Sequence, residues 1–440
     1  MTDLAETATT WMDRWWDPEA NLLWNMEGSF DDHGIAARTL HVVPSSAWYV
    51  CGLLHRDGEG DVDRAVRCIE ALCDLQYDAP GTVWHGTFAR FAESAEPQEG
   101  AVEWVDYDPN WRQFVGTAFA LAIEDVGDHL PVEVVSRMRD AIDLAVDGEP
   151  PGRVPPHYSN IALMKAWLDV ESGQTARGEA LAEQVVDLFA ETGAFMEYGS
   201  PTYYGVDLYA LALWRGRSSS PRLRQWGARL EAALWRDVAR WYHAGLRNLC
   251  GPYARSYGMD MTRYAGALGL WVWDALGRDV APFPDTAAPF DHSHDLCMGP
   301  PVALLGARIP DDAAEALRTF PGEHEVRQVV SEDLGLVATG WLADDVMLGG
   351  YAGARWRAEG QFHPATAHWR APDGSVGWLK LVSRGPLDAI AKAGRLDVTP
   401  TQPFEVVASH DGTFEDGRWT FPGIAFDVEG DLDTGFSLRL

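Results

Sequence analysis

Lysine, cysteine and long hydrophobic runs are all scarce in this sequence of 440 residues. Lysine occurs three times against 32 arginines, and 66 acidic residues outweigh 35 basic ones, so the formal net charge is −31. Because a nucleic-acid partner requires a basic surface, this balance excludes nucleic-acid binding. No stretch approaches the ~18 consecutive apolar residues of a membrane span, so we expect no membrane partner.

The five cysteines are odd in number, scattered along the chain, and form no CxxC pair. This distribution argues against a disulfide framework and against a structural zinc ribbon. The first residues carry acidic and polar side chains where a secretory signal would carry a basic and then an apolar region. We therefore expect a cytoplasmic protein with reduced thiols.

Aromatic residues are abundant by contrast, with 20 tryptophans that suggest an aromatic-lined cleft as well as a core. Apolar residues recur at helical spacing from the start of the chain to about residue 276. The clearest helical patterns cover 61–76, 110–126, 131–146, 157–171, 175–191, 203–216, 221–243 and 259–275. About ten or eleven helices in antiparallel pairs, without a strong sequence repeat, predict a closed α/α toroid.

The composition changes near residue 277, where a segment rich in proline and polar residues begins. A short helical pattern at 311–319 is followed by alternating apolar and polar residues, which predict about seven or eight antiparallel strands. We therefore predict an α+β multidomain protein. It has an α/α toroid over residues 1–276, a linker over 277–310, and an antiparallel β-sandwich over 311–440.

The segment GAFMEYGSPTYYGVDLYALAL, residues 193–213, combines a helix break with several polar aromatic side chains. Gly199, Ser200 and Pro201 interrupt the helical pattern, and Pro201 suits the start of the next helix. Tyr203 and Tyr204 then lie on its first turn. In a toroid, this turn is expected at the rim, where loops carry binding and catalytic residues.

This segment resembles the E-x-S-P-x-Y-H helix of the heparinase II/III and alginate lyase group of polysaccharide lyases. Glu197, Ser200, Pro201 and Tyr203 match, with one extra residue between Glu and Ser, and Tyr204 takes the place of the histidine. The group builds an α/α toroid followed by antiparallel sheets. The resemblance implies that Tyr203 is the catalytic acid, and often the base, and that Glu197 and Tyr204 lie against the substrate.

A second motif of the same group pairs asparagine with histidine on an earlier helix. In PPHYSNIALMKAWL, residues 155–168, Asn160 matches the asparagine, which the resemblance implies neutralises the substrate carboxylate. Ile161 stands in the histidine position. His157 lies three residues before Asn160, where it shares a helical face. We therefore expect His157 or His85 to replace the histidine as the base, or tyrosine alone to act as both acid and base.

The segment LCGPYARSYGMDMTRYAG, residues 249–266, supplies further candidates. Tyr253, Arg255 and Tyr257 share one face if the segment is extended, because alternate residues of a strand point the same way. An arginine beside a catalytic tyrosine is expected to lower the pKa of its hydroxyl from ~10. Asp260 and Arg263 follow with a helical spacing and are further candidates for substrate binding.

Other candidates for substrate binding are Trp84 and His85 in an expected loop, Trp111 and Arg112 at the expected start of a helix, and His363 in the β domain. We predict no metal and no cofactor. The segment DHSHDLC, residues 291–297, offers His292, His294 and Asp295, but a tetrahedral zinc site needs ligands that the sequence does not identify. A solvated linker is therefore the favoured interpretation of this segment.

These residues suit a lyase that cleaves a uronic-acid-containing glycan by β-elimination. Tyrosine would act as acid and base, and Asn and Arg would neutralise the carboxylate. Three alternatives stay open: an α/α-barrel glycoside hydrolase, an isomerase or cyclase of an apolar small molecule, and a non-catalytic glycan-binding protein. The hydrolase would use a carboxyl pair from Asp108, Glu197, Asp207 and Asp260. The expected partner is a glycan or other small-molecule substrate, and a homo-oligomer is possible.

Overall fold

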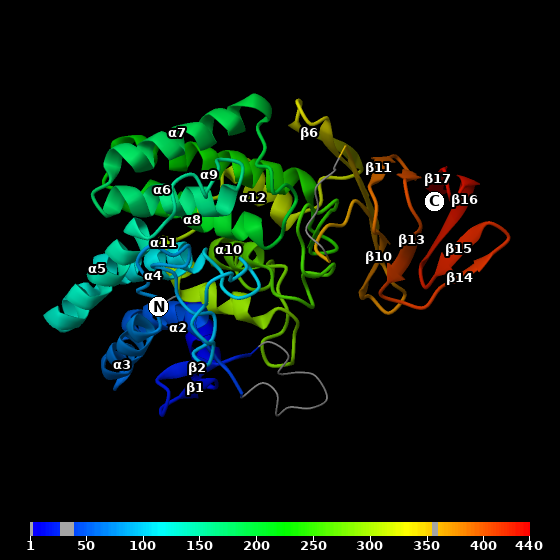
Figure 1. Cartoon of the computed structure of the whole chain (residues 1–440). Coiled ribbons are helices and arrows are strands. Elements are labelled where there is room, and N and C mark those ends of the chain that lie inside the picture. Colours follow the sequence, from blue (N-terminus) through cyan, green and yellow to red (C-terminus); the bar gives the residue numbers. More distant parts are fainter. Residues whose placement is uncertain (1–2, 27–38, 354–359) are drawn as a thin grey trace.

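Helices dominate the chain up to residue 318, and two antiparallel sheets follow from residue 324 onwards (Figure 1). The structure is a computed structural model that describes residues 3–26, 39–353 and 360–440. The predicted order of helical and antiparallel β structure is confirmed. Among the described residues, no helix has the length and apolar character needed to cross a membrane.

Consecutive helices of the helical unit pack against each other in pairs, α2 with α3, α4 with α5, α6 with α7, and α8 with α9. Their apolar faces meet in one large core. The helices are α1 (Asp3–Asp13), α2 (Val43–Arg56), α3 (Asp61–Asp74), α4 (Trp111–Val126), α5 (Val132–Asp147), α6 (Ser159–Glu171), α7 (Thr175–Thr192), α8 (Tyr203–Arg217), α9 (Pro221–Trp241), α10 (Ala267–Leu276), α11 (Gly299–Leu305) and α12 (Asp311–Arg318), with 3-10 turns η2 (Gly127–His129) and η3 (Ser293–Met298).

Two small antiparallel sheets accompany the helices. β1 (Trp16–Asp17), β2 (Leu22–Trp24) and β3 (His41–Val42) form one of them. β4 (Tyr242–His243) and β5 (Asn248–Leu249) form the other, directly after α9. The chain reverses its direction in this second hairpin and then continues as segment 250–266.

The C-terminal part contains two six-stranded antiparallel sheets, in the orders β13-β10-β9-β8-β7-β6 and β11-β12-β17-β16-β15-β14. A second hydrophobic core, which includes Leu348, Leu379, Leu396 and Phe426, joins residues of both sheets. The strands are β6 (His324–Ser331), β7 (Leu336–Ala343), β8 (Val346–Ala352), β9 (Ala365–Arg370), β10 (Val376–Ser383), β11 (Leu387–Lys392), β12 (Arg395–Pro400), β13 (Phe404–Ala408), β14 (Thr413–Glu415), β15 (Arg418–Phe421), β16 (Ile424–Asp431) and β17 (Gly435–Arg439).

The helical unit and the first sheet meet along segment 250–257. The backbone of Tyr253 pairs with that of His363 through N–H···O bonds of 3.1 and 2.9 Å in the two directions. Gly349 of β8 lies so close to Gly251 that a Cβ atom on it would come within 2.1 Å of the Gly251 carbonyl group. The contact is therefore one of backbone against backbone.

Two local expectations from the sequence are wrong. Residues 259–266 are not helical, and α10 begins only at Ala267. The Asp260 carboxylate accepts the Thr262 N–H at 2.9 Å, a side-chain contact that holds a turn in place of a helix. Segment 291–297 is also not solvated, because η3 within it packs against α1, α2 and α10.

Candidate functional site

The tyrosine–arginine cluster, formed by Glu197, Tyr203, Arg255 and Tyr257, is the centre of the candidate site. Tyr203 is the first residue of α8, and its backbone N–H donates to Ser200 Oγ at 3.0 Å. The preceding loop approaches segment 250–257 at Gly199, whose φ is +69° and whose Cβ, if present, would lie 2.4 Å from the Pro252 carbonyl oxygen. Glycine therefore allows the two segments to meet.

Arg255 connects three segments of the chain through its guanidinium group. Its Nη1 donates to Glu197 Oε1 at 2.8 Å, and its Nε donates to Gln361 Oε1 at 3.0 Å. Its Nη2 donates to the Tyr203 hydroxyl at 2.5 Å. The guanidinium carbon also lies 3.9 Å from the centroid of the Tyr203 ring, a cation–π contact. The arginine therefore contacts both the ring and the hydroxyl of Tyr203 and fixes the orientation of this side chain.

Tyr257 is the member of the cluster that is most exposed to solvent. Its hydroxyl lies 2.8 Å from the Tyr203 hydroxyl, and 42% of the residue is exposed, whereas Tyr203 is half-buried. The opposite face of the Tyr257 ring stacks on His292 with a centroid distance of 4.0 Å. Tyr257 remains the more exposed of the two tyrosines.

Burial raises the pKa of the Tyr203 hydroxyl well above its ordinary value of 10, and the neighbouring Tyr257 raises it further. The Arg255 charge acts in the opposite direction but does not prevail. The net direction is contrary to the lowering that the sequence suggested. At neutral pH the hydroxyl therefore carries its proton, which suits a proton donor.

A layer of buried polar groups lies beneath the cluster. The Asn160 amide donates to Glu197 Oε2, and Ser159 Oγ lies 3.3 Å from the same oxygen. Asn160 is buried in this arrangement, with its side chain held on Glu197. Ser159 and Asn160 begin α6, so the start of this helix fixes the glutamate that in turn pairs with Arg255.

Asp207 lies in the same layer, with its Oδ2 3.4 Å from Ser159 Oγ. It is fully buried, and burial together with the charge of Glu197 raises its pKa well above the ordinary 3.8. The Glu197 carboxylate faces Arg255, whereas no cation pairs with Asp207 among the described residues. Burial without a cationic partner therefore favours the protonated form of Asp207 over the charged one.

Tyr204 and Tyr253 point into the core, away from the cluster. The Tyr204 hydroxyl donates to Asp237 Oδ2 at 3.2 Å, and the Tyr253 hydroxyl donates to the Leu249 carbonyl oxygen at 2.5 Å. His363 packs against Tyr253 and is buried, with its Nε2 3.4 Å from Lys380 Nζ. Burial, and then the Lys380 charge, lower the pKa of His363 to about 3.

The remaining candidates are not joined to the cluster by contacts in the described chain. Buried Asp260 accepts the Asn248 amide at 3.1 Å within a turn, and Arg263 is exposed. Arg112 is buried and donates to the carbonyl oxygens of His85, Val83 and Pro109, which holds loop 79–91 on α4. Trp84 packs near Tyr107, and Trp111 near Phe114.

His157 is exposed, two residues before Ser159. His85 is half-buried, and its Nδ1 accepts the Ala79 N–H at 3.1 Å. Of the two candidate histidines, His157 is therefore the one that is close in sequence to Ser159 and Asn160, which contact Glu197. Two residues of backbone extend at most about 7 Å, so His157 starts near the layer.

Sequence reasoning missed three residues that contribute to this arrangement. Two of them, Tyr158 and Ser159, lie inside segment 155–168. Burial raises the pKa of the Tyr158 hydroxyl; the charge of Glu197 raises it further, and the charge of Arg255 lowers it. Gln361 lies two residues before His363 and binds Arg255. This contact joins two segments that lie far apart in the sequence, so no local spacing could have identified Gln361.

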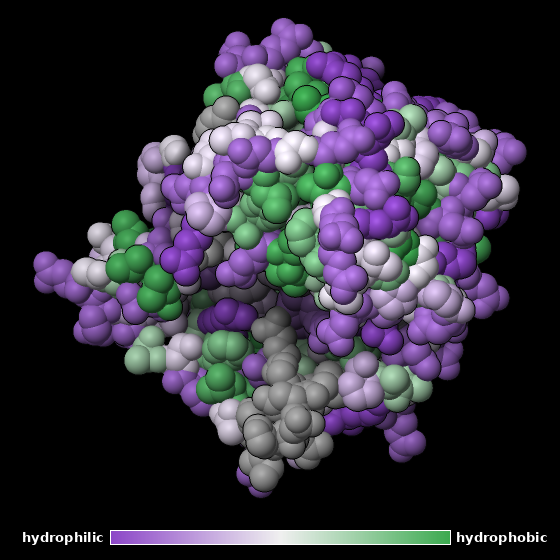
Figure 2. All heavy atoms as spheres, turned by 90° about the vertical axis from the view of Figure 1, so that its right-hand side faces the viewer, coloured by the Kyte–Doolittle hydropathy of each residue, from purple (hydrophilic) through white to green (hydrophobic). Residues whose placement is uncertain are grey.

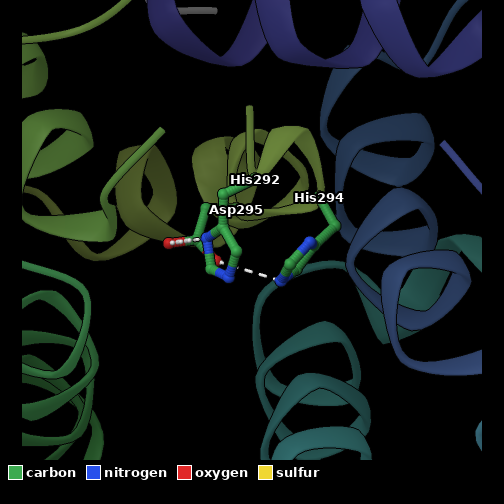
Figure 3. Close-up of side chains that lie close together, drawn as sticks. All are labelled: His292, His294 and Asp295. Carbon is green, nitrogen blue, oxygen red and sulfur yellow. Dashed lines mark ion pairs between the residues drawn. The ribbon is translucent and has the colours of Figure 1, made fainter. Parts of the chain in front are cut away.

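A separate group forms beside Tyr257, where η3 brings His292, His294 and Asp295 together (Figure 3). Each residue offers a ligand atom, and the three atoms lie within 4.8 Å of one another. Nitrogen and carboxylate oxygen are the donors that zinc and similar ions prefer. This group adjoins the cluster through the stacking of Tyr257 on His292.

The molecular surface seen from the side of the sheets is predominantly hydrophilic, with hydrophobic residues in separate patches (Figure 2). A surface hollow elsewhere on the helical unit is lined by residues that include Glu124, Glu171, Arg217 and Arg224. None of the candidate site residues lines that hollow.

The chain belongs to a family described as a domain of unknown function, DUF8769, whose model matches residues 2–307. No curated protein shows significant sequence similarity to it. Among solved structures, it is similar to Streptomyces coelicolor A3 chondroitin AC lyase in complex with chondroitin sulphate, with 13% identity over 99% of this chain and 79% of that chain and a TM-score of 0.36. A mutant of the same lyase matches with 13% identity over 97% and 72% of the two chains and a TM-score of 0.34.

Proposed function

We propose that the protein is an enzyme that cleaves a uronic-acid-containing glycan by β-elimination, with Tyr203 as the acid. The observation that carries this proposal is the half-buried Tyr203 hydroxyl, which keeps its proton and lies 2.5 Å from Arg255 Nη2. A phenol in this position can donate its proton to a leaving oxygen. The same arginine then stabilises the tyrosinate that remains.

In this reaction a base removes the proton α to the uronate carboxylate. The electron pair forms a double bond to the β carbon, the bond from that carbon to the glycosidic oxygen breaks, and the oxygen leaves with the proton of Tyr203. Negative charge develops near the carboxylate during this step and needs hydrogen-bond donors. Three of the five N–H groups of Arg255 are engaged, which leaves two for the substrate.

We assign the base to His157, since it is exposed and starts near Glu197. Asn160 positions Glu197, which in turn holds Arg255 against the Tyr203 ring. Tyr257 passes a proton from solvent back to Tyr203 after each turnover, because the two hydroxyls are hydrogen-bonded and Tyr257 is exposed. We further propose that the paired helices form an α/α toroid and the two sheets a β-sandwich.

The hydrolase alternative has one observation in its favour, namely that Glu197 and Asp207 both contact Ser159 Oγ while only Glu197 pairs with an arginine. A glycosidase uses such a pair, with one carboxyl neutral and one ionised. Its general acid must touch the glycosidic oxygen, however, and Asp207 is fully buried. Tyr203 is accessible and Asp207 is not, which favours elimination.

The test is to incubate the protein with a panel of uronic-acid-containing glycans and to follow two signals in the same samples. Elimination produces new reducing ends together with the ultraviolet absorbance of an unsaturated uronate, in equal amounts. Hydrolysis produces reducing ends alone. New reducing ends without that absorbance would overturn the lyase proposal in favour of the hydrolase.

A further inference from the structure

We propose that His292, His294 and Asp295 bind a divalent transition-metal ion such as Zn²⁺, at a site that adjoins the tyrosine–arginine cluster. This inference goes beyond the proposed function and does not depend on it. It starts from the placement of the three side chains by one short segment, in which His292 precedes η3 and Asp295 follows at i+3. Residues at this spacing lie on the same side of a 3-10 helix.

The spacing of the donor atoms fits a small tetrahedral ion. His294 Nε2 lies 3.5 Å from Asp295 Oδ1, and one ligand atom from each of the three residues falls within 4.8 Å of the others. With metal–ligand bonds of ~2.0–2.1 Å, two ligands of a tetrahedral zinc ion lie about 3.4 Å apart. His294 and Asp295 therefore already have the spacing that the ion requires, and the third ligand atom lies within 4.8 Å of both.

Backbone contacts orient two of the ligands. His292 Nδ1 lies 3.2 Å from the Ala265 carbonyl oxygen and 3.4 Å from Asp295 Oδ2, and these contacts fix the orientation of the ring. Asp295 Oδ2 accepts the Ala267 N–H at 3.0 Å, which leaves Oδ1 on the side of His294. Contacts of this kind to carbonyl oxygens and carboxylates typically fix metal-binding histidines.

Burial and access also suit a bound ion. The exposed fractions of the side chains are 11% for His292, 25% for His294 and 6% for Asp295. A buried carboxylate is costly unless a positive group compensates its charge, and a dication supplies that charge. The greater exposure of His294 provides a route of entry for the ion.

The donor set selects the class of ion. Two imidazoles and one carboxylate favour Zn²⁺ and related transition metals, whereas Mg²⁺ and Ca²⁺ prefer oxygen ligands. Three protein ligands leave a fourth position for water or for an oxygen atom of a bound molecule. Since Tyr257 stacks on His292 and hydrogen-bonds with Tyr203, the ion lies beside the tyrosine pair.

The test uses the full chain after treatment with a chelator, and titrates Zn²⁺ by calorimetry and Co²⁺ by absorption spectroscopy. We expect one ion per chain, intense Co²⁺ bands typical of tetrahedral coordination, and no binding of Mg²⁺ or Ca²⁺ at the same concentrations. His294→Ala and His292→Ala should lower Zn²⁺ affinity by more than the ~10–100-fold that loss of a supporting contact costs. Asp291→Asn, an exposed neighbour in the same segment, should leave the affinity unchanged.

Folding of each variant is checked by circular dichroism, and His294→Gln, which keeps the side-chain volume, serves as a second variant if His294→Ala does not fold. Absence of stoichiometric Zn²⁺ binding, or equal affinity in the wild type and the folded His294 variant, would overturn the proposal. The titrations contain no glycan, so they succeed or fail independently of the lyase assay. Tyr203→Phe is expected to bind Zn²⁺ normally.

Discussion

Two tyrosines that are adjacent in sequence have opposite surroundings in this protein. Tyr203 is half-buried at the cluster and bonds to Arg255 and Tyr257, while Tyr204 is buried and bonds to Asp237. They point in different directions because successive residues of a helix are rotated by about 100°. The pair therefore offers a matched comparison of a proposed catalytic hydroxyl with a structural one.

Tyr203→Phe should reduce the rate of elimination by at least ~100-fold, because the leaving oxygen loses its proton donor. The free energy of unfolding should fall by about 1–3 kcal/mol, because the hydroxyl bonds to Tyr257 and to the charged Arg255. Tyr204→Phe should leave the rate near that of the wild type. Steady-state kinetics and melting temperatures of both variants check this prediction, and a Tyr203→Phe enzyme with a third of normal activity would contradict it.

Asp207→Asn should stabilise the protein at pH 8. The folded-state pKa of Asp207 is raised, so its contribution to stability is fully present below the unfolded pKa of 3.8 and is lost as the pH rises above it. Asparagine stays neutral at every pH and avoids that loss. The increase in melting temperature over the wild type should therefore be largest at high pH and vanish near pH 4.

The same variant separates the two mechanisms. Under the lyase proposal, Asp207→Asn keeps its activity, because the buried carboxyl never touches the substrate. A folded Asp207→Asn protein without activity would instead support the carboxyl pair of the hydrolase.

His157→Ala should lower turnover by ~10²–10⁴-fold if His157 is the base. Its melting temperature should not change, because the side chain is exposed. His129→Ala, an exposed histidine that follows α4, is the control and should behave as the wild type. Near-normal turnover of His157→Ala would move the base to His85 or to Tyr203 itself.

At the scale of elements, the periodicity of apolar residues predicted most helices to within one or two residues. Patterns at 110–126 and 175–191 correspond to α4 (111–126) and α7 (175–192). It failed for segment 259–266, where the side chain of Asp260 competes with the helical backbone for hydrogen bonds. It also missed α11, because Pro300 and Pro301 stand in the first turn of that helix, where proline is tolerated.

Sequence reasoning identified those site residues that lie in segments with a recognisable pattern, namely Tyr203, Glu197 and Arg255. The structure brings these three together. Gln361 could not be placed, because its contact with Arg255 crosses from the sheet to the helical unit. Packing also decided the direction of Tyr253, which alternation alone placed in the site, and that of His363, the candidate from the β domain. Long-range contacts of this kind have no signature in local spacing.

Gly349→Ala should destabilise the protein by about 1–3 kcal/mol, the usual cost of overpacking, since the added methyl group would overlap Gly251. It should also lower turnover, because segment 250–257 carries Arg255 and Tyr257. Gly216→Ala in α8 is the control. Its Cβ would meet nothing within 4 Å, and alanine favours a helix over glycine by about 1 kcal/mol. Denaturant unfolding of both variants measures the difference, and equal stabilities would contradict the prediction.

At the scale of the whole molecule, the junction between the helical unit and the first sheet is sensitive to acid. Burial lowers the pKa of His368 to about 4 and that of His363 to about 3. His368 Nε2 lies 2.8 Å from the Met259 carbonyl oxygen, so both rings are buried between the sheet and segment 250–260. Both histidines are therefore neutral in the folded protein at neutral pH.

Stability should fall as the pH decreases from about 6.5 towards 4, because the unfolded chain gains protons that the folded chain excludes. The depressed pKa of His368 corresponds to a loss of about 3 kcal/mol over this range. His368→Gln should weaken the pH dependence of the free energy of unfolding. His410→Gln, which replaces a half-buried histidine beside Trp369, should not. Identical pH profiles for wild type and His368→Gln would contradict this assignment.

The family match ends at residue 307, yet Gln361, which holds the Arg255 guanidinium, belongs to the part of the chain beyond it. Glu197, Tyr203 and Arg255 lie within the part of the chain that the family model covers, but one of the three hydrogen bonds that fix the Arg255 guanidinium does not. A helical unit without the sheets would therefore lack both the Gln361 acceptor and the close backbone contact of Gly349 with Gly251.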